Sequence, residues 1–83
     1  MEYTEFGKAL KKILIEKGVR VYDVAKRLGV SSAFVSSVIT GKKNVPETWI
    51  ESLKKLLNLT EEESVLLEIG YEKKNNQFVI DSE

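Results

Sequence analysis

The sequence begins with apolar residues spaced as on one face of an α-helix. They lie at i, i+4, i+7 and i+8, and they are Phe6, Leu10, Ile13 and Leu14. This period predicts a helix over residues 4–17, which ends at Gly18 because glycine readily adopts the left-handed conformation of a helix C-terminus. Two shorter stretches repeat the period and predict helices over about 21–28 and about 31–40. Ser31 is the expected N-cap of the third helix.

The second half of the chain predicts two more helices and a different C-terminal segment. Pro46 suits the first turn of a fourth helix, whose buried stripe is Trp49, Ile50, Leu53, Leu56 and Leu57. Thr60 and Glu63 match a capping box and predict a fifth helix over about 61–70. Beyond Tyr71 the period is lost, and residues 77–81 resemble a short strand. Such a strand needs a partner, either a nearby segment or the same strand of a second chain.

Composition restricts the chemistry open to this chain. Its 83 residues, of which 42% are hydrophobic and 31% charged, suit a single globular domain. It has no Cys and no His, so Cys/His zinc sites, imidazole acid–base chemistry and Ser-His triads lack their reagents. Glu61, Glu62 and Glu63 suit the positive end of a helix dipole. We therefore assign no metal, no cofactor, no small-molecule effector and no enzymatic activity.

Charge is balanced overall but unevenly distributed. The chain has 13 basic and 13 acidic residues. Residues 1–59 hold eleven basic and six acidic residues, whereas residues 60–83 hold two and seven. This asymmetry is typical of a basic binding surface beside an acidic tail. Apolar runs are only a few residues long, so we expect neither a membrane span nor a signal peptide. We therefore expect a cytoplasmic protein.

The most informative pattern lies at residues 21–40, VYDVAKRLGVSSAFVSSVIT. Ala25 is small, a glycine follows four residues later, and the apolar positions are Val24, Leu28, Val30, Val35 and Val38. Two helices that cross closely through a tight turn need such residues. The segment resembles the helix-turn-helix of the XRE family of Cro-like, phage-repressor-type transcriptional regulators. The likeness covers roughly residues 5–70, since GKKNVPETWIESLKKLLNLTEEE also resembles that family's junction between its fourth and fifth helices.

The resemblance implies an all-α, five-helix lambda-repressor-like fold. The DNA-binding domain would span residues 1–70, with its helix-turn-helix unit at 21–40 and a C-terminal extension at 71–83. The third helix would lie in the major groove of double-stranded DNA, and its expected base contacts are Ser32, Ala33, Phe34, Ser36 and Ser37. The expected phosphate contacts are Arg20, Val21, Tyr22, Ser31, Thr40, Lys42, Lys43 and Asn44.

Several of these residues have a second interpretation. Phe34 could contact a thymine methyl or sugar, or it could pack against a neighbouring helix. Family members often carry a phosphate-binding Gln at the start of the second helix, where this chain has Val21. Five other lysines are expected on solvated helix faces, namely Lys8, Lys11, Lys12, Lys54 and Lys55.

Two functions follow from this pattern. We expect a sequence-specific repressor that binds a pseudo-palindromic operator as a homodimer, because one helix-turn-helix makes few base contacts. The expected dimer contact is the C-terminal strand, through Phe78, Val79 and Ile80. The alternative is a protein-interaction module, antitoxin-like or anti-repressor-like, with weak or no DNA binding. Zero net charge, Val21 and the serine-rich third helix favour that alternative.

Overall fold

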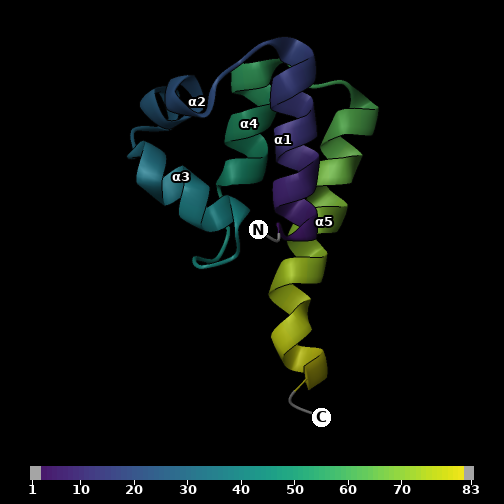
Figure 1. Ribbon diagram of the computed structural model, residues 1–83. Coiled ribbons are helices and arrows are strands. Elements are labelled where there is room, and N and C mark those ends of the chain that lie inside the picture. The colour runs from purple at the N-terminus through teal and green to yellow at the C-terminus, as the bar shows by residue number, and fades with distance from the viewer. Residues whose placement is uncertain (1–2, 82–83) are drawn as a thin grey trace.

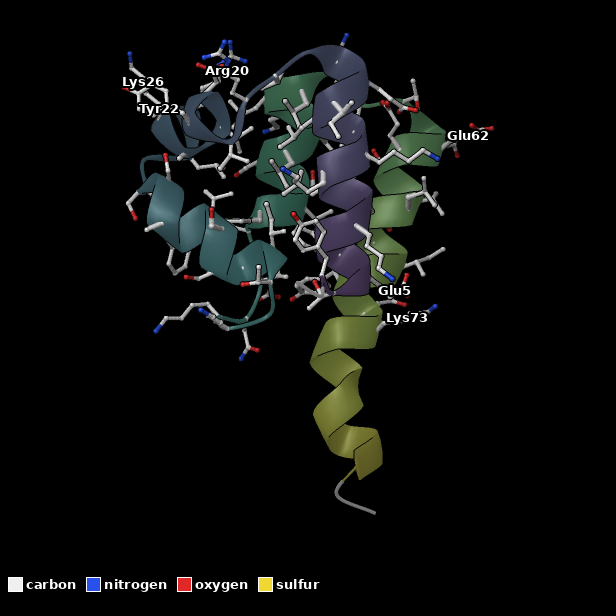
Figure 2. All side chains as sticks on the ribbon, viewed as in Figure 1. Glu5, Arg20, Tyr22, Lys26, Glu62 and Lys73 are labelled. Atoms are coloured by element: carbon white, nitrogen blue, oxygen red, sulfur yellow. The ribbon has the colours of Figure 1, made fainter. Side chains whose placement is uncertain are left out.

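The computed structural model describes the backbone of residues 3–81 and the side chains of residues 3–73 (Figures 1 and 2). Within this range the chain is all-α, as predicted, and contains five helices in the order α1 (Glu5–Lys17), α2 (Val21–Leu28), α3 (Ser32–Ile39), α4 (Trp49–Leu57) and α5 (Glu61–Asp81). Figure 1 shows α1 and α4 between the α2–α3 pair on one flank and α5 on the other. None of the described helices is long and apolar enough to cross a membrane.

The core draws apolar side chains from each helix and from the loop before α4. These buried residues are Phe6, Leu10, Ile13, Leu14, Val24, Ala25, Val35, Val38, Ile39, Val45, Trp49, Leu53, Leu57 and Leu67. The apolar stripe predicted for the first helix is confirmed, and so is the assignment of Trp49 to the core. From residues 61–73 of α5, whose side chains the structure describes, the core takes one apolar side chain, that of Leu67, so the other apolar residues in the first half of that helix lie nearer the surface.

The start of α1 is joined to the end of α3 through the carbonyl of Ile39. The Thr4 amide donates to that oxygen at 3.3 Å and the Thr4 hydroxyl donates to it at 3.2 Å. The same hydroxyl accepts from the Gly7 amide at 3.0 Å and so caps α1. These bonds satisfy backbone groups that helix ends leave without an intrahelical partner. Gly7 lies against the Ile39 carbonyl, where a Cβ atom would collide with it.

The fifth helix is longer than the pattern predicts. The sequence suggests a helix end near Gly70 and a strand at 77–81, but the backbone is helical as far as Asp81. A Cβ on Gly70 would lie 2.6 Å from the Phe6 Cα, so this glycine serves the close approach of α5 to α1 rather than a helix end. No Pro or Gly follows it before Asp81. The strand prediction is therefore wrong, and the side chains of Phe78, Val79 and Ile80 lie outside the described residues.

The turn into α4 also differs from the prediction. Pro46 lies before the helix, and its carbonyl accepts from the Trp49 amide at 3.0 Å. Proline thus shapes a separate turn, and α4 begins only at Trp49.

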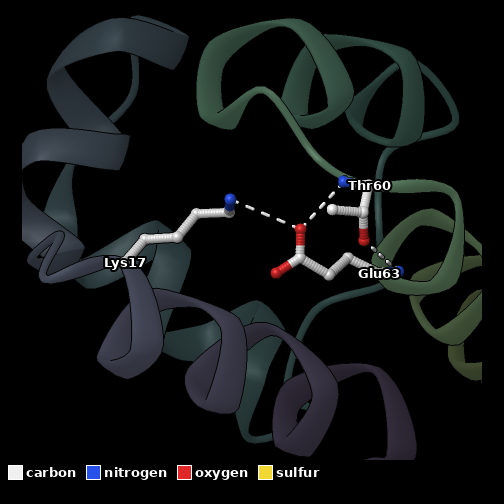
Figure 3. A network of polar contacts seen from close by, with 3 residues as sticks. All are labelled: Lys17, Thr60 and Glu63. Carbon is white, nitrogen blue, oxygen red and sulfur yellow. Dashed lines mark hydrogen bonds and ion pairs between the residues drawn. The ribbon is translucent and has the colours of Figure 1, made fainter.

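The capping box predicted at the start of α5 is confirmed (Figure 3). The Glu63 carboxylate accepts from the Thr60 amide at 2.9 Å, and the Thr60 hydroxyl accepts from the Glu63 amide at 3.2 Å. Lys17 of α1 forms an ion pair with the same carboxylate at 3.3 Å. The Thr60 amide and the Lys17 ammonium stabilise the ionised form and lower the pKa of Glu63. This carboxylate consequently joins the end of α1 to the start of α5.

Lys54 connects α4 to α5 instead of standing alone on a solvated face. Its ammonium lies 2.9 Å from Glu68 and 3.5 Å from Glu51. The hydrogen bond to Glu68 is the main cause that raises the pKa of Lys54, since the carboxylate favours the charged amine.

Candidate nucleic-acid interface

A tight turn positions α3 against α2. Gly29 has φ of 75°, a left-handed value that glycine adopts without steric cost. Its amide donates to the Lys26 carbonyl at 3.2 Å, and the Val30 amide donates to the Ala25 carbonyl at 3.0 Å. This pair of bonds is a Schellman motif. Ala25 is buried, which lets the two helices cross closely. The turn and small residue predicted from the sequence are both confirmed.

The outer face of α3 is open to solvent. Ser31 caps the helix by accepting from the Phe34 amide at 3.0 Å, while Val35 and Val38 point into the core. Ala33 and Ser36 are exposed, and Ser32 and Ser37 are half-buried. Because α5 lies on the opposite flank of α1 (Figure 1), neither it nor another described segment covers this face. The face can therefore meet a large partner.

The hydroxyls on this face differ in their hydrogen-bonding capacity. Ser37 donates to the Ala33 carbonyl at 2.9 Å, and Thr40 donates to the Ser36 carbonyl at 3.0 Å. Each of these hydroxyls has used its one proton within α3 and can only accept from a partner. The side-chain hydroxyls of Ser32 and Ser36 make no hydrogen bond with any residue in the described part of the chain. Both can still donate as well as accept.

Phe34 packs inward. Its ring meets Trp49 edge-on, with centroids 5.8 Å apart and an interplanar angle of 79°. Aromatic pairs favour this T-shaped arrangement. This geometry corresponds to the interpretation in which Phe34 packs against a neighbouring helix.

The start of α2 provides one edge of the interface. Arg20, Tyr22 and Lys26 project outward from this part of the molecule in Figure 2, and Tyr22 is 63% exposed. The amides of Val21 and Tyr22 donate to no acceptor within the described residues. Free amides at the positive end of a helix dipole suit an anion. Asp23 turns its carboxylate to the Arg20 amide at 3.4 Å.

Not every cation of α2 points toward this surface. The guanidinium of Arg27 donates to the Leu56 carbonyl of α4 at 3.3 Å. Arg27 therefore joins α2 to α4, whereas its equally exposed neighbour Lys26 makes no such bond with the described part of the chain.

The loop after α3 provides the opposite edge. The amides of Lys42 and Lys43 both donate to the Ser37 carbonyl, at 2.8 and 3.1 Å, which holds the backbone of the loop on the end of α3. The side chains of Lys42, Lys43 and Asn44 are exposed. Two cationic side chains thus stand at a defined place beside the outer face of α3.

A surface groove connects the two edges. Its lining comes from the segment before α1, from α1, α2 and α3, and from the loop after α3. It consists of Tyr3, Lys11, Val21, Ser36, Ser37, Ile39, Thr40 and Lys42. Tyr3 and Lys11 are absent from the site predicted from the sequence, which places Lys11 on a solvated helix face. No local signal separates Lys11 from Lys8 or Lys12, because its position in the groove depends on the packing of α1 against α3.

The surroundings of α3 are electropositive. Residues 18–46, which include α2, the turn, α3 and the loop, contain five basic residues and one acidic residue. The zero net charge of the whole chain conceals this local excess.

Two helices that cross through a tight turn, with the outer face of the later helix uncovered as in α2 and α3, define the helix-turn-helix class of DNA-binding proteins. A family model described as "Helix-turn-helix domain" matches residues 5–67 of the 83-residue chain. The chain belongs to this family and is a DNA-binding helix-turn-helix protein, a class that is typically not enzymatic. No curated protein and no solved structure was found to match it.

Proposed function

We propose that this protein is a transcriptional repressor of the Cro-like XRE type. It binds a pseudo-palindromic operator in double-stranded DNA as a homodimer and excludes polymerase by occupying that site. One observation carries the proposal: the outer face of α3 is uncovered, the exposed Lys42 and Lys43 follow its C-terminal end, and the exposed Arg20 stands at the start of the neighbouring α2. The B-DNA major groove, ~12 Å wide, admits one helix between two phosphate ridges.

The side chains that read the bases are those on the outer face of α3 whose polar or apolar groups are free to contact DNA. Ser32 and Ser36 donate or accept, and Ala33 contacts a thymine methyl group. Ser37 acts only as an acceptor, because its hydroxyl already donates a hydrogen bond to the Ala33 carbonyl. Such a helix discriminates modestly at one half-site, so selectivity requires two half-sites about one DNA turn apart, each occupied by one subunit of the homodimer.

Phosphate contacts fix the register of α3 in the groove. The free amides of Val21 and Tyr22 meet one strand at the start of α2. Lys42 and Lys43 meet the backbone at the end of α3, and Lys11 joins them through the groove. These contacts contribute affinity that is independent of sequence, because every nucleotide carries the same phosphate.

Binding to duplex DNA over a range of salt concentrations, followed by selection from a random pool, tests the proposal. Affinity should fall steeply with salt, and the selected sites should share a pseudo-palindrome. In a transcription reaction with purified polymerase, protein added to a promoter that carries the selected site should lower the transcript yield. Selection without any shared half-site symmetry would contradict the homodimeric operator.

Two substitutions separate the proposed roles. Lys43→Ala should weaken binding to all sequences and reduce the log–log salt slope by about 0.9, whereas Ser36→Ala should change the preferred base at one position of each half-site. Lys55→Ala is the matched control, since Lys55 is an exposed lysine on α4, outside the α2–α3 unit. A change of operator preference in Lys43→Ala would show that the contacts are wrongly sorted.

The internal hydrogen bonds of Ser37 and Thr40 favour a second candidate function. These bonds leave few free hydrogen-bond donors on the outer face of α3, which suits a protein-interaction module of the antitoxin-like or anti-repressor-like kind. Such a module would bind neither random nor selected DNA at low salt, and Lys43→Ala would not change its behaviour in the binding assay.

A further inference from the structure

The first half of α5 presents an apolar stripe on the side away from the core. Val65, Leu66 and Ile69 are 45%, 46% and 46% exposed, whereas Leu67 and Gly70 of the same helix are buried. Val65 and Leu66 also line a shallow recess together with Glu61 and Glu62. Contiguous exposed apolar residues commonly mark a surface of association.

The stripe has opposite charges at its two ends. Glu62 and Lys73 stand at i and i+11, with Leu66 at i+4 and Ile69 at i+7, which is the spacing of one helix face. Figure 2 shows that Glu62 and Lys73 project from the same side of α5. At 1.5 Å rise per residue they are separated by about 16 Å along the helix, so they cannot pair with each other within one chain.

We propose that this stripe binds the same stripe of a second copy, with the two α5 helices antiparallel. We call the surface formed by Glu62, Val65, Leu66, Ile69 and Lys73 the α5 stripe. In a two-fold arrangement, residue positions that face each other add to the same number. Leu66 then meets Ile69 of the partner subunit, and Glu62 meets Lys73 of the partner subunit, each pair occurring twice.

Charge selects the antiparallel arrangement. A two-fold axis along α5 would make the helices parallel and would place each Glu62 and each Lys73 beside its own copy. Like charges in contact oppose association, whereas the antiparallel pairing converts the same four side chains into two ion pairs.

The position of the α5 stripe is compatible with the DNA interface. α5 and α3 lie on opposite flanks of α1 (Figure 1), so pairing through α5 leaves the outer face of α3 uncovered in both subunits. The biological role of this contact rests on the proposed function, because it would supply the homodimer that two half-sites require. The contact itself is tested without DNA.

Sedimentation equilibrium of the full chain at low salt tests the surface by charge reversal. Wild-type protein should form dimers, and Glu62→Lys and Lys73→Glu should each raise the dimer dissociation constant by about tenfold, since each reversal creates two like-charge contacts. The double variant should return to within a few-fold of wild type, because its ion pairs are restored with opposite polarity. A single chain, or another interface, would not produce this recovery.

Matched controls separate the stripe from general effects of charge and apolar area. Glu47→Lys and Lys55→Glu make the same charge changes at exposed positions outside α5, and neither should weaken the dimer. Ile69→Gln should weaken it, whereas Ile15→Gln should not, because Ile15 is 74% exposed on α1 but lies outside the stripe. Thermal unfolding of each variant confirms that the fold is retained.

Three results would overturn the proposal: a wild-type chain that stays monomeric throughout the micromolar range, single reversals that dimerise like wild type, or a double variant that does not recover. The outcome is independent of the proposed function. A chain that dimerises through the α5 stripe but does not bind duplex DNA refutes the repressor alone. A chain that binds DNA with salt-dependent affinity while the charge reversals have no effect refutes the α5 stripe alone.

Discussion

Substitution of Gly7 by alanine tests the contact between α1 and α3. A Cβ at this position would overlap the Ile39 carbonyl oxygen and lie 2.9 Å from the carbonyl carbon. Both atoms belong to the backbone and cannot turn aside as the end of a side chain could. The two helices must therefore separate, and separation lengthens the two hydrogen bonds that Thr4 donates to Ile39.

The expected loss of stability follows from three contributions. Overpacking a close contact costs about 1–3 kcal/mol. Weakening the Thr4 hydrogen bonds adds about 0.5–1.5 kcal/mol for each bond that is lost. The higher helix propensity of alanine offsets at most about 1 kcal/mol of this destabilisation. The net destabilisation is about 2 kcal/mol, which for a domain of this size lowers the unfolding temperature by about 8–16 °C.

Thermal and urea unfolding followed by circular dichroism measure this loss. Lys8→Ala, at the exposed neighbouring position, should stay within about 0.5 kcal/mol of wild type. A double-mutant cycle adds a sharper test. Thr4→Val removes the hydrogen bond from the Thr4 hydroxyl to Ile39 and keeps the one from the amide, so its effect and that of Gly7→Ala should sum to more than the effect of the double variant. If Gly7→Ala unfolds at or above the wild-type temperature, the contact is looser than described and the reasoning is refuted.

Three further substitutions address α5 and its cap. Gly70→Ala should destabilise the fold by about 1–2 kcal/mol in urea unfolding, because its Cβ would lie 2.6 Å from the Phe6 Cα, and unchanged stability would contradict the close approach of α5 to α1. Thr60→Ala should cost about 1 kcal/mol through loss of the N-cap, and an effect near zero would mean that the cap is dispensable. Glu63→Gln should lower the unfolding temperature at neutral pH but not in strong acid. The lowered pKa of Glu63 stabilises the fold above the ordinary value of 4.5, and this contribution is lost as pH falls through the folded pKa, so a constant difference across pH would exclude the charge as its cause.

Local patterns in the sequence determined the positions of most helices and of the tight turn between α2 and α3. The predicted second helix, 21–28, coincides with α2, and the predicted first and third helices differ from α1 and α3 by single residues at their ends. The Ser31 cap and the Thr60–Glu63 capping box were likewise predictable. Each of these features depends on residues only three or four positions apart, so a segment of about one helical turn is enough to predict it.

Tertiary structure decided what several of those residues do. Gly70 resembles a helix end in the sequence, but the proximity of Phe6 makes it a site of close approach. Lys11 is one of three similar lysines until α1 packs against α3 and brings it into the groove. Phe34 has two interpretations until Trp49 lies beside it. The partners in these cases are distant in the chain, and a periodic pattern carries no information about which distant residue a side chain will meet.

The α5 stripe shows the same difference between what the sequence determines and what tertiary packing determines. The sequence shows that Val65, Leu66 and Leu67 are consecutive apolar residues and that Glu62 and Lys73 are charged. Only the packing of α5 on α1 decides that Leu67 is buried while Val65 and Leu66 stay at the surface. Helical periodicity determines which side chains share a face, but the direction in which that face points depends on the neighbours that the folded chain provides.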